Sequence, residues 1–322
     1  MRAFILLPLL LSGATLLAAA TQPSSAPDHS TAAGWVKYRR NPVLGGNLGT
    51  CFDVSVLHED GRYWMWFSWR PKRSIGLVES PDGFHWGKPT IVLAPNPSSG
   101  WEEDINRPAV LKVGGRYRMW YTGQAHGHSW IGYATSADGR TWSRVSKRPV
   151  LSPEQPWEKV AVMCPDVLYD RTTSRYKMWY SGGEQYEPNA IGYATSSDGL
   201  HWTRGRRNPV FEPEPKHAWE KDRVTACHLI RRGGWYIMFY IGFHEQQHAQ
   251  IGAARSRDGV TGWQRHPANP IVRPSARAWD ADAVYKPFAL FDGRRWLLWY
   301  NGRRDSVEQI GVALHEGRDL GF

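Results

Sequence analysis

The stretch SIGLVESPDGFHW at residues 74–86 occurs in related form four more times along the chain. The related stretches are WIGYATSADGRTW (130–142), AIGYATSSDGLHW (190–202), QIGAARSRDGVTGW (250–263) and QIGVALHEGRDLGF (309–322). Their Ile-Gly pairs begin at residues 75, 131, 191, 251 and 310, so one unit spans 56 to 60 residues. Each unit carries only strand and turn signals, which is typical of a propeller blade. The sequence therefore predicts an all-β protein with a single five-bladed β-propeller.

One unit reads as a four-stranded antiparallel blade. In the second unit an apolar strand at 106–112, a Gly-Gly turn and the alternating strand RYRMWY (116–121) are followed by a third strand at 130–135. Asp138-Gly139 then leads to a short outer strand, and Asp-Gly between two strands predicts a hairpin turn. We expect the first strand to lie nearest the axis. The loops before the first strands and those between second and third strands then share one face.

The two ends of the chain are expected to meet in the last blade. In three internal units a Trp is followed seven residues later by Pro-Val or Pro-Ile. These pairs are Trp142 and Pro149, Trp202 and Pro209, and Trp263 and Pro270. The fifth unit stops at Phe322 without this element, but the same spacing occurs from Trp35 to Pro42. We therefore expect the segment at Trp35 to complete the last blade as its outer strand, which leaves no open sheet edge.

The N-terminal segment is expected to be a leader. Residues 1–20 combine a basic start, an apolar run and three alanines, which is typical of a secretory signal peptide. Residues 21–34 are polar and are expected to form a disordered leader. The propeller domain is then 35–322. A secreted or periplasmic location follows, and the apolar run is too short to predict a membrane span.

Composition limits the partners. The formal net charge is +10, but the basic residues are scattered, which argues against nucleic acid. A carbohydrate substrate, including an anionic one, fits this charge, and we expect a monomer. Cys51, Cys164 and Cys227 fall in expected inner strands and are interpreted as buried free thiols. No zinc-type spacing occurs, so no metal site or cofactor is expected; a central calcium or chloride ion is compatible with the fold.

An alignment of the expected inner strands identifies a polar layer near the axis. Counting ten residues back from the aromatic residue that begins each second strand gives Asp53, Arg107, Asp166, Ala226 and Lys286. A purely structural repeat would carry the same apolar residue in every blade. Charged residues in this layer instead predict a polar funnel, at a place where a rigid scaffold can hold a site.

The loops on the same face add further charge. The loops before inner strands 2 to 5 begin with Trp and an acid, and this acid is expected to be structural. The four acids are Glu102, Glu158, Glu220 and Asp280. A second acid, three residues after the Trp, occurs in three loops, as Asp104, Asp222 and Asp282, and we expect at least one to reach the funnel. The loops between second and third strands supply more polar residues, among them Arg70, His128, Glu184, Tyr186, Glu245, Arg303 and Glu308.

The repeat number, the blade pattern and the place of the acids resemble the five-bladed glycosidase superfamily, which includes glycoside hydrolase families 43, 62, 32, 68, 117 and 130. In families 43 and 32 an Asp at the first inner strand acts as base or nucleophile, and Asp53 in CFDVSV matches it, with Val54 in place of the usual Pro. EDINRP (103–108) partly resembles the Arg-Asp-Pro motif of the second blade. In the third blade Met163 stands where family 32 has its acidic Glu. The resemblance therefore implies a divergent member.

These observations predict an exported glycoside hydrolase that acts on an oligo- or polysaccharide, with furanosides among the options. Glycosidic cleavage needs one carboxylic acid to protonate the leaving oxygen and a second carboxylate to activate water or attack carbon. We predict Asp53 as base or nucleophile, Asp166 or Glu184 as acid, and Asp104 as the residue that orients it. The predicted substrate-binding residues are Arg70, Asn106, Arg107, His128, Tyr186, Asp222, His228, Glu245, Asp282, Lys286 and Arg303.

Two other functions fit the same funnel. A glycoside phosphorylase would need a phosphate pocket built from cations, for which Arg107, Lys286, Arg303 and Arg304 are available. A non-catalytic glycan-binding propeller would use the funnel for recognition alone. A lectin of this shape tends to repeat one pocket in each blade, whereas the polar layer here differs from blade to blade.

Overall fold

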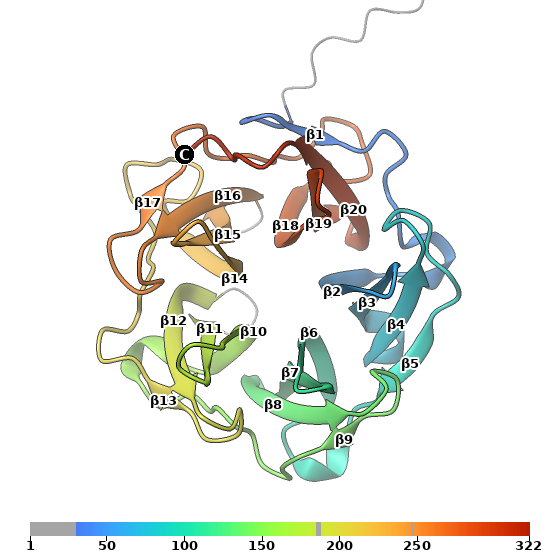
Figure 1. Cartoon of the computed structure of the whole chain (residues 1–322), viewed down its shortest axis with the longest axis vertical. Coiled ribbons are helices and arrows are strands. Elements are labelled where there is room, and N and C mark those ends of the chain that lie inside the picture. Colours follow the sequence, from blue (N-terminus) through green and yellow to red (C-terminus); the bar gives the residue numbers. More distant parts are fainter. Residues whose placement is uncertain (1–29, 185–187, 246–247) are drawn as a thin grey trace, which may run out of the picture.

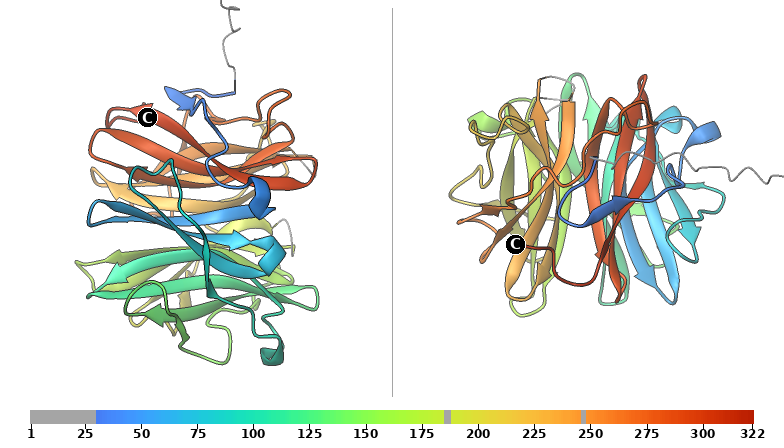
Figure 2. Two further views of the ribbon diagram at one scale, coloured as in Figure 1. Left: turned by 90° about the vertical axis from the view of Figure 1, so that its right-hand side faces the viewer. Right: turned by 90° about the horizontal axis from the view of Figure 1, so that it is seen from above.

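The computed structural model describes residues 30–184, 188–245 and 248–322 and is a five-bladed β-propeller (Figure 1). Each blade is a meander of four antiparallel strands whose first strand lies beside the axis. In the side views the strands run between the two faces of the ring (Figure 2). The predicted fold class is therefore confirmed.

The strands follow the predicted order in every blade. Blade 1 contains β2 (Cys51–Glu59), β3 (Arg62–Trp69), β4 (Ser74–Ser80) and β5 (Thr90–Leu93), and blade 2 contains β6 (Asp104–Val113), β7 (Arg116–Ala125), β8 (His128–Ser136) and β9 (Ser143–Arg144). Blade 3 contains β10 (Ala161–Asp170), β11 (Arg175–Gly183), β12 (Pro188–Ser196) and β13 (Thr203–Arg204), and blade 4 contains β14 (Arg223–Arg232), β15 (Trp235–His244), β16 (His248–Ser256) and β17 (Gln264–Arg265). Blade 5 contains β18 (Ala283–Phe291), β19 (Arg295–Arg304), β20 (Val307–Glu316) and β1 (Trp35–Lys37). The connecting segments include the short 3-10 helices η1 (Gly46–Leu48), η2 (Arg70–Lys72), η3 (Pro97–Ser99) and η4 (Pro156–Glu158).

The N-terminal strand completes the last blade, as the sequence predicted. Strand β1 pairs antiparallel with β20, with Trp35 opposite His315. Beyond β1, the amide of Asn41 donates to the carbonyl of Val312 and accepts its N–H, each at 2.9 Å. Asn208 and Asn269 make the same paired bonds to β12 and β16. The segment near the N-terminus therefore has the same structure as the outer elements of the internal blades.

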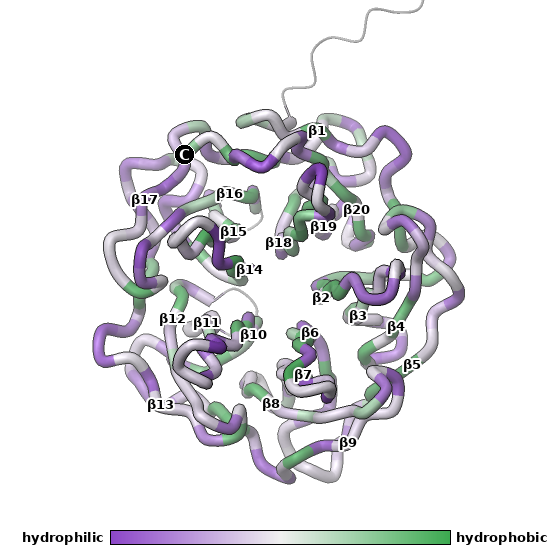
Figure 3. Tube along the Cα trace, viewed as in Figure 1, coloured by the Kyte–Doolittle hydropathy of each residue, from purple (hydrophilic) through white to green (hydrophobic). Residues whose placement is uncertain are grey.

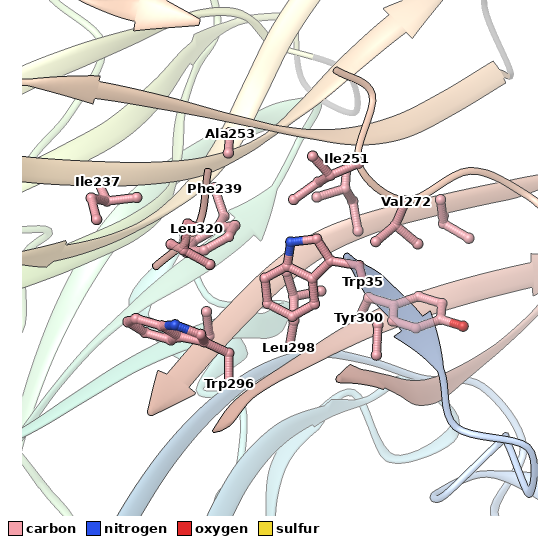
Figure 4. Packing of buried hydrophobic residues seen from close by; sticks show 14 residues of the cluster. Trp35, Ile237, Phe239, Ile251, Ala253, Val272, Trp296, Leu298, Tyr300 and Leu320 are labelled. Carbon is pink, nitrogen blue, oxygen red and sulfur yellow. The ribbon is translucent and has the colours of Figure 1, made fainter. Parts of the chain in front are cut away.

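The ring also closes through the hydrophobic core. Trp35 is buried and packs edge-on against Phe239 of blade 4, with ring centroids 5.9 Å apart (Figure 4). Trp142 makes the equivalent contact with Trp66 between blades 2 and 1, at 6.3 Å. The aromatic contact that joins neighbouring blades is thus kept where the chain ends meet.

The folded domain begins earlier than expected. Thr31 bridges to Val272, and the N–H of Arg273 donates to the carbonyl of Ser30 at 2.7 Å. Residues 30–34, which the sequence placed in a disordered leader, therefore pack on blade 4. Residues 1–29, which include the predicted signal peptide, lie outside the described residues.

Polarity follows the layers of the fold. Apolar stretches lie along the strands, while the loops at the rim are mostly hydrophilic (Figure 3). The three cysteines are buried and free, as predicted. Within the described ranges, no helix has the length and apolar character needed to cross a membrane.

Candidate functional site

Each inner strand is interrupted by a bulge at the same depth in the ring. The strand register shifts there, and the residue at the bulge has φ between 40° and 55°. These five residues are Asp53, Arg107, Cys164, Ala226 and Lys286, and all five line one cavity. Non-glycine residues with positive φ are uncommon, and bulges re-aim side chains. The repeat therefore uses the same backbone distortion in every blade to present a different side chain at the axis.

The bulges are held by the preceding blade. The backbone N–H of Asp53 donates to Asn301 Oδ1 at 2.9 Å, and that of Arg107 donates to Ser68 Oγ at 2.7 Å. The same bond joins Cys164 to Thr122 and Ala226 to Ser181, at 3.1 and 2.8 Å. These acceptors lie five residues after the aromatic residue that begins each second strand. In blade 4 that place belongs to Ile241, whose side chain has no acceptor.

The structure corrects the predicted axial layer in the third blade. The residue at the bulge is Cys164, and Asp166 lies two residues further along β10. The inner hairpin of this blade pairs Tyr169 with Tyr176, whereas blade 1 pairs His58 with Tyr63, so its turn is two residues longer. Counting ten residues back from Tyr176 therefore stops at Asp166, two residues short of the bulge. The layer holds one carboxylate, two cations, a thiol and an alanine.

A cavity of about 200 Å³ opens at the N-terminal ends of the inner strands. Its charged lining residues are Asp53, Arg70, Arg107, Lys286, Arg303 and Glu308. Its apolar and aromatic lining includes Phe52, Met163, Ile241, Phe243 and Tyr285. Loops between second and third strands contribute to it, so the cavity lies on the face where the sequence predicts a site. Five predicted site residues meet here, namely Asp53, Arg70, Arg107, Lys286 and Arg303.

Asp53 is buried and held on both carboxylate oxygens. Asn301 Nδ2 donates to Oδ1 at 2.6 Å, and Arg107 Nε lies 3.1 Å from Oδ2. Behind Arg107, Asn106 Oδ1 accepts a hydrogen bond from its guanidinium. Asn106 itself is buried and does not line the cavity. It was predicted to bind substrate, but its contacts instead position the guanidinium beside Asp53.

Glu308 is the second carboxylate of the cavity. Its Oε1 accepts a hydrogen bond from the Tyr285 hydroxyl, and its Oε2 lies 3.1 Å from Arg70 Nη2. Burial raises the pKa of Tyr285 well above its ordinary value, and the charge of Glu308 adds to this rise. Arg70 also covers the Phe52 ring, 4.2 Å from its centroid. The sequence identified Glu308 only as a polar loop residue, and nothing in the spacing marked Tyr285.

The predicted acid Glu184 lies outside the cavity. Its side chain is 55% exposed and pairs with Lys159 at 2.7 Å. The hydrogen bond from Lys159 lowers the pKa of Glu184, which is the wrong direction for a general acid. The interpretation of Glu184 as the acid is therefore not supported by its surroundings.

The acids three residues after the loop Trp do not line the cavity either. Asp104 accepts a bond from Asn106 and lies 3.8 Å from Arg73. Asp222 and Asp282 are exposed and cap loops through the backbone N–H groups of Glu245 and Asp305. The expectation that one of them reaches the funnel was wrong for the part of the cavity that the structure describes.

Two further predicted binding residues are not brought into the cavity. His128 is exposed and stacks on Trp130, and Glu245 is exposed beside His244 and His248. Tyr186 lies outside the described residues. Loop polarity alone did not identify side chains that face the axis.

Asp166 and His228 lie at the other end of the channel. They line a second cavity of about 380 Å³, which is mostly apolar. His228 Nδ1 lies 3.0 Å from Asp166 Oδ1, and Asp166 Oδ2 accepts the N–H of Leu229 at 2.8 Å. This pair joins blades 3 and 4 below the bulges. The structure thus separates both residues from Asp53, against their predicted roles as acid and substrate ligand.

The acids directly after the loop Trp are structural, as predicted. All four are fully buried, and each accepts a hydrogen bond from a tyrosine and from a cation. The tyrosine partners are Tyr121, Tyr180, Tyr240 and Tyr300. The cations are Arg144, Arg204, Arg265 and Lys37. Across the described ranges, no group of three or more His, Cys, Asp or Glu side chains is placed to hold a metal ion.

The model of the glycosyl hydrolases family 43 matches residues 39–318. The chain belongs to glycosyl hydrolase family 43. This confirms the predicted superfamily and makes the protein a glycoside-acting enzyme by family. The third and fourth bulges of this family 43 protein carry Cys164 and Ala226, so neither supplies a carboxylate to the cavity.

The chain is also similar to individual proteins and to solved structures. The family 43 chain is 28% identical over 223 residues to an uncharacterized protein of Mycobacterium tuberculosis, covering 65% of this chain and 70% of that protein. It is 27% identical over 243 residues to a 1,2-beta-oligomannan phosphorylase of Thermoanaerobacter sp., covering 71% of this chain and 75% of that protein. A solved glycoside hydrolase superposes with a TM-score of 0.73 at 20% identity, covering 91% of this chain and 92% of its own. The last match confirms the fold.

Proposed function

We propose that this protein is a glycosidase that cleaves off a terminal sugar bound in the axial cavity, with Asp53 and Glu308 as the reacting carboxylates. The observation that carries the proposal is that these two are the carboxylates lining the cavity among the described residues. Tyr285 and Arg107 each interact electrostatically with both. The cavity is below the usual size range of ligand pockets, which favours a single sugar ring over a long chain.

Asp53 has the surroundings of a general base. Arg107 and Asn301 hold its two oxygens in place, and the bulge aims the side chain at the axis. An ionised carboxylate fixed in this way can take a proton from a water that attacks the anomeric carbon. The resemblance to families 43 and 32 implied the role of base or nucleophile for this residue.

Glu308 supplies the proton in this proposal. The water oxygen bonds to the anomeric carbon and its proton passes to Asp53. The bond from that carbon to the leaving oxygen breaks, and the leaving oxygen takes the proton of Glu308. The Arg70 side chain is 51% exposed, so a substrate can displace its guanidinium and leave Glu308 beside Tyr285.

A second candidate is phosphorolysis in the same cavity. Four cations line it, and one of the similar proteins is a phosphorylase. In that reaction inorganic phosphate replaces water as the attacking group. We also propose that the protein is exported, because residues 1–20 have the pattern of a secretory signal peptide.

The test is a product screen of the mature protein over a broad panel of oligosaccharides and polysaccharides, with and without phosphate. Wild type is compared with Glu308→Gln and with the matched control Glu184→Gln. We expect release of a monosaccharide without phosphate, lost in Glu308→Gln and kept in Glu184→Gln. Release that requires phosphate would favour the second candidate. Release that depends on Glu184 rather than Glu308 would contradict the proposed acid.

A further inference from the structure

We propose that the floor of the axial cavity is a binding site for an acidic group carried by the substrate sugar, such as the carboxylate of a uronic acid, with Lys286 at its centre. The inference rests on the proposed function only in that the ligand is the sugar that fills this cavity. It concerns binding, and it stands or falls separately from the assignment of the reacting carboxylates.

The first observation is the isolation of Lys286. This residue is 4% exposed and lines the cavity. Its side chain forms no hydrogen bond and no ion pair with any residue that the structure describes. Lysines are almost never fully buried unless they are paired, because an isolated charge is costly to remove from water. Among the described residues the ammonium group therefore has no partner, which leaves it available to an anion.

The second observation is that neighbouring groups do not neutralise this charge. Cys164 and Cys227 interact with Lys286, but burial raises the pKa of both thiols, so they stay uncharged near neutral pH. Asp53 is paired with Arg107, and Glu308 is paired with Arg70. Counted over the described lining, four cations face two carboxylates. Over its described lining the cavity thus carries more cationic than anionic side chains, which favours an anionic ligand.

Lys286 lies deep in the cavity, at the level of Asp53. The bulges separate the two axial cavities, since Tyr285 and Lys286 line the upper one and Phe288 lines the lower one. Lys286 thus lies at the floor of the upper cavity. Arg70 in η2 and Arg303 near the end of β19 are less buried than Lys286. Asp53 lies in the same bulge layer, so an acidic substituent on the sugar held beside Asp53 is within this part of the cavity.

Apolar lining makes the charge interaction stronger. Phe52, Met163, Ile241 and Phe243 are buried and also line this cavity. Charge-assisted hydrogen bonds contribute more than neutral ones, and more so where water is excluded. We therefore expect discrimination between an acidic sugar and its neutral parent.

The test measures binding to the full mature chain carrying Asp53→Asn, which removes turnover from the assay. Isothermal titration compares galacturonate, glucuronate and mannuronate with galactose, glucose and mannose. We expect at least one uronate to bind more than about tenfold tighter than its neutral parent. We expect Lys286→Met to abolish this preference, and the matched control Lys159→Met, at an exposed lysine outside the cavity, to keep it.

Two further measurements keep the proposal falsifiable if Lys286→Met folds poorly. In the Lys286-containing protein, uronate affinity should fall between 50 and 500 mM salt while the affinity for the neutral parent stays constant. Inorganic phosphate should compete with the uronate without being needed for cleavage by wild type. Equal affinity for acidic and neutral sugars would overturn the proposal. So would unchanged uronate binding in Lys286→Met, or a strict requirement for phosphate, which would assign the cations to a co-substrate.

Discussion

Lys37 Nζ lies 2.6 Å from Asp280 Oδ2, in a buried ion pair that joins the N-terminal strand to the last blade. Lys37 comes two residues after Trp35, and in blades 2, 3 and 4 an arginine comes two residues after the equivalent outer Trp. Each of these arginines pairs with the acid that follows the loop Trp, at 2.6 to 2.8 Å. The chain therefore closes with the same ion pair that each internal blade uses.

The first prediction concerns this closing pair. Lys37→Met leaves the carboxylate of Asp280 buried without its cation, so we expect a loss of about 3–5 kcal/mol in the free energy of unfolding. Urea unfolding at neutral pH measures this loss. The matched control is Arg62→Met, because Arg62 pairs with Glu79 at 3.9 Å with a side chain that is 68% exposed, and we expect it to cost less than about 1 kcal/mol. Similar losses in the two variants would contradict the account.

The closure of the ring by the N-terminal strand was predictable because turn residues and aromatic residues mark each repeat. The fifth unit lacks the outer element, and the same element occurs at Trp35. This pattern predicts that the two chain ends meet in the last blade. The start of the folded domain was not predictable in this way. Thr31 pairs through its backbone with Val272, and such a contact leaves no signal in side-chain pattern.

The second prediction concerns the bulges. Ser68 is fully buried, and its Oγ accepts the N–H of Arg107 at 2.7 Å. Ser68→Ala leaves this buried N–H without an acceptor, so we expect a loss of about 1–3 kcal/mol in the free energy of unfolding. Ser143→Ala, at an exposed position of β9, is the control and should change stability little. If both substitutions are neutral in urea unfolding, the bulge does not depend on the preceding blade.

The third prediction is a loss of stability at alkaline pH. Burial raises the pKa of Tyr121 above its ordinary value, and the negative charge of Glu102 adds to this rise. The unfolded chain releases the tyrosine proton near pH 10, whereas the folded chain keeps it. Deprotonation therefore favours unfolding, and stability should fall as pH rises above about 10. Thermal unfolding between pH 8 and 11 should show a steeper fall in wild type than in Tyr121→Phe; equal slopes would contradict this.

The fourth prediction concerns the hydroxyl beside Glu308. Tyr285→Phe removes the hydrogen bond to Glu308 Oε1 while keeping the aromatic wall of the cavity. We expect kcat to fall about 10- to 100-fold with a smaller change in KM, and the pH profile of kcat to shift. Steady-state kinetics on the substrate found in the product screen measures both. An unchanged pH profile would contradict the prediction that the Tyr285 hydroxyl influences Glu308 as the proton donor.

The candidate site was predictable only in part. Asp53, Arg107 and Lys286 were found because one spacing holds in four blades. The ten-residue spacing failed in the third blade. The longer turn there places Asp166, and not the bulge residue Cys164, ten residues before Tyr176. The Pro that follows Arg107 and Lys286 also follows Cys164, and this signal marks the bulge correctly. Glu308 could not be chosen from sequence, because its place at the axis depends on its contacts with Tyr285 and Arg70.

The central claim is that Asp53, aimed at the axis by its bulge, is the base of a glycosidase. The most direct measurement is the cleavage rate of wild type, Asp53→Asn and Asp104→Asn on the first glycan that the product screen identifies. The account predicts a loss of about 10²- to 10⁴-fold in Asp53→Asn and a change of no more than a few fold in Asp104→Asn, whose side chain lies outside the cavity. Retained cleavage in Asp53→Asn, or an equal loss in Asp104→Asn, would contradict it.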